Sequence, residues 1–106
     1  MRKIDQKLQN AIKANKPFSS GNTAFISNDN ECKILLHGNV IAKRSLNVLK
    51  LDNCGYATNV THARLNAVLQ AFNYRNVKVI GKGWNTLFID TNTNTVIAKN
   101  ELSLNI

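Results

Sequence analysis

The side chains that could carry catalysis are few and scattered along the 106 residues. The only histidines are His37 and His62, and the only cysteines are Cys32 and Cys54. Cys54 and His62 could be imagined as a nucleophile and its base, but their spacing matches no pattern typical of that chemistry. Both histidines are therefore expected to have structural roles, and both cysteines to be reduced, half-buried thiols rather than a disulfide.

The acidic residues do not form a catalytic or metal-binding pattern either. They are Asp5, Asp29, Glu31, Asp52, Asp90 and Glu101. General acid–base catalysis and two-metal hydrolysis both need carboxylates that converge, and only Asp29 and Glu31 are close in sequence, within one predicted turn. No CxxC pair or Cys/His cluster indicates zinc. The sequence thus predicts a protein that is not an enzyme and uses no metal or cofactor.

The most informative polar segment is residues 74–84, YRNVKVIGKGW, which contains no acid. Arg75, Lys78 and Lys82 lie between Tyr74 and Trp84. Cations neutralise phosphates and aromatic rings stack on bases, so this composition is typical of a surface that binds DNA or RNA.

Each feature of this segment also has a structural interpretation. Gly81-Lys82-Gly83 is too short for a phosphate-binding loop and is expected to form a hairpin turn. Trp84 is the only tryptophan of a small chain, and we expect it in the core rather than as a stacking platform.

A second basic cluster spans residues 2–16. Its cations are Arg2, Lys3, Lys7, Lys13 and Lys16, against Asp5 alone. The apolar stripe of Ile4, Leu8, Ala11 and Ile12 predicts an amphipathic helix over residues 3–15 that ends at Lys16-Pro17. Such a helix could bind a membrane, a partner's groove or nucleic acid. Because the stripe is aliphatic and lacks Trp and Phe, we expect it to dock on the protein's own sheet.

The charge of the whole chain favours an anionic partner. Fourteen Lys and Arg against six Asp and Glu give a net charge of +8. This excludes mimicry of DNA and suits nucleic acid or an acidic protein face, although charge also serves solubility. No apolar run is long enough for a membrane span and no secretory signal is visible, so the expected location is the cytoplasm.

Period-2 patterns broken by turn residues predict antiparallel strands from residue 23 to 53. The runs TAFISN, CKILL, VIAKR and NVLKL form a four-stranded meander, after a loop at residues 19–22. His37-Gly38-Asn39 is expected to close a tight hairpin, because Gly and Asn tolerate positive φ.

A core helix follows, with Thr61 as its predicted cap and a stripe of Leu65, Val68, Leu69 and Phe72. VKVI, TLFID and TVIAK are predicted strands, and the tail alternates Leu102, Leu104 and Ile106 as an edge strand would. The expected fold is therefore α+β: an N-terminal helix, a four-stranded meander, a core helix and two or three further antiparallel strands. One domain covers residues 1–106.

Three motifs resemble a family of small, uncharacterised tailed-phage proteins. These are Leu-His-Gly-Asn-x-Ile-Ala at residues 36–42, Gly-Tyr-x-Thr at 55–58 and Thr-x-x-Arg-Leu-Asn-Ala at 61–67. Within the motifs Arg64 and Asn66 have no evident core role, which makes them candidates for contact with a partner, although Arg64 could simply neutralise a neighbouring charge.

The resemblance implies a phage origin, and small phage proteins of this kind often occlude host machinery, including defence systems built on nucleic acid. The first hypothesis is thus a phage accessory protein that binds and inhibits a host protein or nucleoprotein complex. The second is direct binding of DNA or RNA through residues 2–16 and 75–82. The oligomeric state is left open.

Overall fold

The structure is a computed structural model that describes residues 1–105. It contains two helices and nine strands in these residues, and the predicted α+β fold is confirmed. In chain order the elements are α1 (Lys3–Ala14), β1 (Phe18–Ser20), β2 (Thr23–Ser27), β3 (Cys32–Leu36), β4 (Asn39–Arg44), β5 (Val48–Asp52), α2 (Asn59–Ala71), β6 (Val77–Lys82), β7 (Asn85–Asp90), β8 (Thr95–Lys99) and β9 (Glu101–Asn105).

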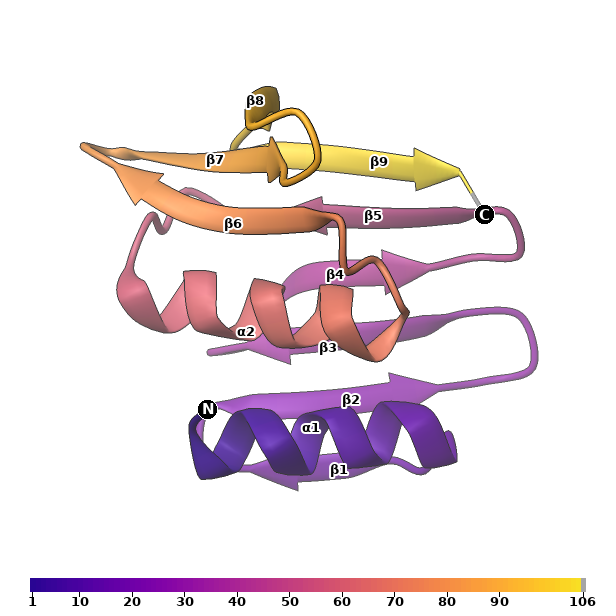
Figure 1. Cartoon of the computed structure of the whole chain (residues 1–106). Coiled ribbons are helices and arrows are strands. Elements are labelled where there is room, and N and C mark those ends of the chain that lie inside the picture. The colour runs from indigo at the N-terminus through magenta and orange to yellow at the C-terminus, as the bar shows by residue number, and fades with distance from the viewer. Residues whose placement is uncertain (106) are drawn as a thin grey trace.

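The strands form two antiparallel sheets. The larger has the order β1-β2-β3-β4-β5-β9, and the smaller has the order β6-β7-β8. The chain leaves the large sheet after β5, forms α2 and the small sheet, and returns as β9 beside β5 (Figure 1). The predicted four-stranded meander is β2–β5, and the predicted edge strand of the tail is β9. Ile106, the last position of that expected alternation, lies outside the described residues.

Both helices lie on one face of the large sheet. The small sheet contacts α2 through β6, on the side of α2 that faces away from α1 (Figure 1). One hydrophobic core cluster joins these layers. It includes Leu8 of α1, Phe25 and Leu49 of the large sheet, Leu65 of α2 and Phe88 of the small sheet. As predicted, the apolar stripe of α1 docks on the protein itself, with Leu8 and Ile12 buried.

Helix α1 ends where the sequence predicts. Asn15 adopts the left-handed conformation with φ of 51°, and its N–H bonds to the carbonyl groups of Ala11 and Ile12. An asparagine tolerates this conformation better than most residues with a Cβ atom, so it serves as the C-terminal cap. Pro17 then follows between α1 and β1, outside any helix or strand.

The start of α2 differs from the prediction. Thr58, not Thr61, is the N-cap, because the Thr58 hydroxyl accepts a hydrogen bond from the N–H of Thr61. The helix therefore begins one turn earlier, at Asn59. Thr61 occupies the third helical position, where its hydroxyl is 3.0 Å from that of Thr58.

Two turns also correct the sequence analysis. The β3–β4 hairpin is tight as expected, but its two positive φ angles are at His37 (51°) and Gly38 (79°), and Asn39 already belongs to β4. Two successive positive φ angles are typical of a type I′ turn. Residues 19–22 are not a simple loop, since Ser19 and Ser20 pair with Ala24 and Thr23 as part of β1.

Candidate binding surface

The β6–β7 hairpin presents the largest exposed aromatic side chain among the described residues. Trp84 is 95% exposed, at the turn between Lys82 and Asn85. The expectation that Trp84 packs in the core is therefore wrong. The turn centres on Gly83 and Trp84, and Gly83 has a φ of 61°, which glycine adopts without strain. A two-residue turn points its side chains away from the core, and this local geometry outweighs the usual preference of Trp for burial.

Gly81 and Lys82 were expected in that turn, but both belong to strand β6. A Cβ atom at Gly81 would lie 2.7 Å from Cε1 of His62 on α2. A residue with a Cβ atom would fit here only if the imidazole ring moved, so glycine lets β6 lie close to His62.

A buried polar cluster holds the base of the hairpin. Nε2 of His62 lies 2.7 Å from the Thr86 hydroxyl, which also accepts a hydrogen bond from Nδ2 of Asn53 at 2.9 Å. Asn100 joins the cluster, since its Oδ1 accepts from the N–H of Thr86 at 2.8 Å. The hairpin carrying Trp84 is thus bonded to α2, to the end of β5 and to the β8–β9 junction.

These contacts are compatible with a neutral His62. The Oδ1 of Asn53 accepts from the N–H of Gly55, so its NH₂ group faces Thr86. Because the Thr86 hydroxyl accepts that bond, its own hydrogen is free to be donated to Nε2 of His62. Burial lowers the pKa of His62, which favours this neutral form. His62 supports the fold through Thr86 rather than pairing with Cys54.

The cations of segment 75–82 reach solvent. Arg75, Lys78 and Lys82 are all exposed. Tyr74 is half-buried against the core at the other end of β6, where its hydroxyl lies 3.5 Å from the Asn105 carbonyl oxygen. The two aromatic residues that bracket this segment in the sequence therefore do not form one stacking platform.

The second predicted patch is also at the surface. Lys3, Lys7 and Lys13 of α1 are exposed, as are Arg2 and Lys16 beside it. Helix α2 lies between α1 and β6, so the structure does not merge the two basic patches into one (Figure 1). On α2 the exposed residues are the neutral Asn59 and Gln70.

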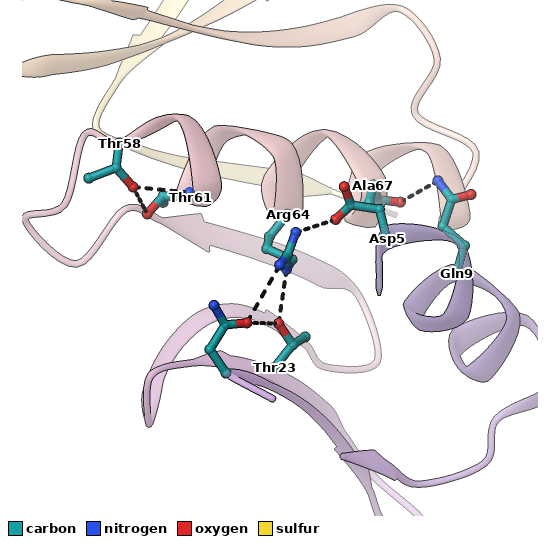
Figure 2. Close-up of polar contacts among 8 residues, drawn as sticks. Asp5, Gln9, Thr23, Thr58, Thr61, Arg64 and Ala67 are labelled. Carbon is teal, nitrogen blue, oxygen red and sulfur yellow. Dashed lines mark hydrogen bonds and ion pairs between the residues drawn. The ribbon is translucent and has the colours of Figure 1, made fainter. Parts of the chain in front are cut away.

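Arg64 is not a surface contact. It is 3% exposed, and its Nη1 donates to the Asp5 carboxylate at 2.7 Å (Figure 2). Its Nε donates to the Thr23 hydroxyl at 2.9 Å. The guanidinium thus joins α2 to α1 and β2, and the alternative that it neutralises a neighbouring charge is the one the structure supports.

Asn66 likewise has a structural role. Its Nδ2 donates to the Val79 carbonyl oxygen at 2.9 Å, and its Oδ1 accepts from the Val79 N–H at 2.8 Å. The side-chain amide thus makes the two hydrogen bonds that a neighbouring strand would make, along the edge of β6 that does not face β7. Asn66 therefore attaches the small sheet to α2.

A row of lysines crosses the large sheet and was missed by the sequence analysis. Lys43 lies opposite Lys33 on one side and Lys50 on the other. Glu31 contacts Lys33 at 3.5 Å and Lys43 at 3.3 Å, and the hydrogen bond from Lys43 lowers the pKa of Glu31. Each lysine lies on the solvent-facing side of its own strand, but only the register between the strands makes the three lysines neighbours.

An apolar hollow lies where α2 begins. It has a volume of about 460 Å³ and is lined by Leu36, Ile41, Cys54, Tyr56 and Val60, among others. The Cys54 thiol lies 3.2 Å from the Val40 carbonyl oxygen, and burial raises its pKa. A raised pKa disfavours the reactive thiolate.

The described residues hold no group of three His, Cys, Asp or Glu side chains that could bind a metal ion. Cys32 and Cys54 are free thiols, as predicted. Across residues 1–105, neither helix has the length and apolarity needed to cross a membrane.

Comparison with known proteins shows that the chain is a tailed-phage protein. It belongs to the family described as Kyanoviridae Gp96 protein, whose model matches residues 1–103 and whose function is unknown. The predicted phage family is confirmed at this level, while the three motifs stay a prediction. Neither the curated proteins nor the solved structures gave a match.

Proposed function

We propose that this chain is a non-enzymatic phage accessory protein that binds a host complex handling nucleic acid or acting in defence, and inhibits it by occlusion. The observation that carries the proposal is Trp84, which is 95% exposed at the tip of a hairpin whose base is buried. The chain belongs to a phage protein family, and a phage protein would meet such a partner in the infected host cell.

An exposed tryptophan on a rigid support is suited to binding. Trp buries roughly 150–250 Å² when covered, and Trp and Arg are enriched among the residues that dominate the affinity of protein interfaces. Because His62, Thr86 and Asn53 hold the hairpin, little conformational entropy is lost when a partner covers Trp84.

Direct binding of DNA or RNA is the second candidate. The exposure of Arg75, Lys78 and Lys82, and of the α1 lysines, favours it. Contact with about five phosphates would give a plot of log K against log salt with a slope of roughly −3.5 to −4.5.

The test of the first proposal is capture of host proteins from nuclease-treated lysate by the tagged protein. We expect one stoichiometric host complex, which Trp84→Ala loses. The matched control is Leu46→Ala, because Leu46 is 80% exposed but lies in the β4–β5 turn at the opposite end of the molecule (Figure 1).

Recovery of no stoichiometric complex, or equal recovery by Trp84→Ala, would contradict the proposal. In the second case the hairpin is not the contact. For direct binding, titration of labelled DNA and RNA at several salt concentrations gives the slope. A slope near zero, or no binding at low salt, rules that candidate out.

A further inference from the structure

The small sheet has an outer face that turns away from the core. On β6 the side chains of Val77 and Val79 are buried, so Lys78, Ile80 and Lys82 point the other way. Strand register extends this face across the sheet. Ile80 lies opposite Leu87, which lies opposite Lys99, and Lys78 lies opposite Ile89, which lies opposite Val96.

The centre of this outer face is aliphatic. Ile80, Leu87 and Ile89 are half-buried, and Val96 is 55% exposed. Trp84 stands at one end of the same hairpin. Contiguous apolar patches on soluble proteins, unlike single scattered apolar residues, mark sites of interaction, particularly when polar residues surround them.

The charge on the outer face is of one sign. Lys78, Lys82 and Lys99 surround the aliphatic centre, and all three are exposed. The only carboxylate of β6–β8 is Asp90, which lies opposite the buried Val77 and so belongs to the inner face. The outer face therefore combines an apolar centre with a cationic rim, and an occupant must complement both.

We propose that the outer face of the β6–β8 sheet docks an acidic protein surface that has an apolar centre. This rests on the proposed function and names the chemistry of the partner. Lysines at the rim would meet Asp and Glu of the partner, while Trp84 and the aliphatic side chains would be covered by its apolar residues.

The aliphatic centre of the outer face favours a protein partner over nucleic acid. Sheets that bind single strands present aromatic rings on which successive bases stack. Here the positions between the lysines are Ile, Leu and Val, which gain most from contact with other aliphatic groups. Trp84 supplies one ring, at the end of the face rather than its centre.

Charge reversal with a matched control tests the cationic rim. One variant carries Lys78→Glu, Lys82→Glu and Lys99→Glu, and the control carries Lys3→Glu, Lys7→Glu and Lys13→Glu on α1. Both lower the net charge from +8 to +2, and all six lysines are exposed. We expect the sheet variant to bind the captured host protein at least about tenfold more weakly and the α1 variant to stay within about threefold of the parent.

Photocrosslinking tests the position without changing charge. In the test variants a photoreactive phenylalanine derivative replaces Val96 or Trp84. In the control variants it replaces Ile26 or Leu46, which are 49% and 80% exposed and lie outside the β6–β8 sheet. Positions 96 and 84 are expected to give a protein adduct whose linked segment is rich in acidic and apolar residues, whereas positions 26 and 46 give none.

The outcomes separate the two proposals. If a host complex is captured but the sheet variant binds it as well as the α1 variant does, or crosslinks arise from position 26, the proposed function stands and the docking face is wrong. A nucleic-acid adduct at position 96 overturns the protein partner in favour of direct DNA or RNA binding. If no partner is captured, both proposals fail.

Discussion

The guanidinium of Arg64 and the carboxylate of Asp5 form an ion pair of 2.7 Å between two helices, and each side chain is only 4% exposed. Arg64 also donates to Thr23 of β2, so one residue joins α1, α2 and the large sheet. The outward-facing lysines of α1 depend on this attachment, because the pair, together with Leu8 and Ile12, fixes which side of the helix meets the core.

Removing Asp5 should leave Arg64 as an uncompensated buried charge. Asp5→Ala is expected to lower the free energy of unfolding by about 3–5 kcal/mol, measured by urea denaturation. Replacing both partners with apolar residues, as in Asp5→Leu with Arg64→Met, should restore much of this loss. Lys7→Ala on the exposed side of α1 is the control and should change stability by under about 0.5 kcal/mol. A loss below about 1 kcal/mol in Asp5→Ala would show that the pair does not hold the helices.

Stability should fall in mildly acidic solution because of His62. Burial lowers its folded-state pKa below the ordinary value of 6.5, so just below that pH the unfolded chain takes up a proton that the folded chain does not. The contribution of His62 to stability is therefore complete above about pH 6.5 and is lost as the pH falls, at no more than about 1.4 kcal/mol per pH unit.

Urea denaturation at pH 7.5 and 5.5 measures this effect. His62→Gln should flatten the pH dependence in this range, whereas His37→Gln, in the exposed β3–β4 turn, should leave it as in the parent protein. Equal pH dependence in all three proteins would contradict the assignment to His62.

The close passage of β6 over His62 predicts a specific coupling. Gly81→Ala places a methyl group 2.7 Å from the imidazole, and we expect a loss of about 1–3 kcal/mol in the free energy of unfolding. In a His62→Ala background the same substitution meets no ring and should cost clearly less. A double-mutant cycle gives the coupling energy. If Gly81→Ala costs the same in both backgrounds, the contact with the ring is not what requires glycine.

Trp84 should report its exposure directly, since it is the only tryptophan. Its fluorescence in the folded protein should resemble that of a water-exposed indole, with strong quenching by iodide and acrylamide and little change of wavelength on unfolding. Trp84→Ser should alter the free energy of unfolding by under about 0.5 kcal/mol, because few packing contacts are lost. A blue-shifted, protected emission would mean that the side chain is covered in the free protein.

Local pattern was enough for most of the secondary structure. The i, i+4, i+7, i+8 stripe predicted α1, and alternation with Gly and Asn turns predicted the meander and a tight hairpin at residues 37–39, although the positive φ angles are at His37 and Gly38 rather than at Gly38 and Asn39. These signals act over a few residues, so they can be recognised in the sequence alone. β1 was missed, because Ser19 and Ser20 carry no apolar alternation and form a strand only by pairing with β2.

The roles of the candidate site residues were decided by tertiary structure. Nothing near Arg64 in the chain indicates burial, since Asp5 is 59 positions away. Asn66 likewise acquires its role from Val79, and Trp84 is exposed because the turn lies at Gly83 rather than earlier.

Composition and short-range periodicity are properties of the chain alone, and they were enough to predict a small basic α+β protein with two concentrations of cations. Alternation along β6 also puts Lys78 and Lys82 on one side of that strand. Only strand register adds Lys99 to the same face, because it pairs Lys99 with Leu87 and Leu87 with Ile80. A binding surface depends on which side chains are neighbours in space, and pairing between distant segments sets those neighbours.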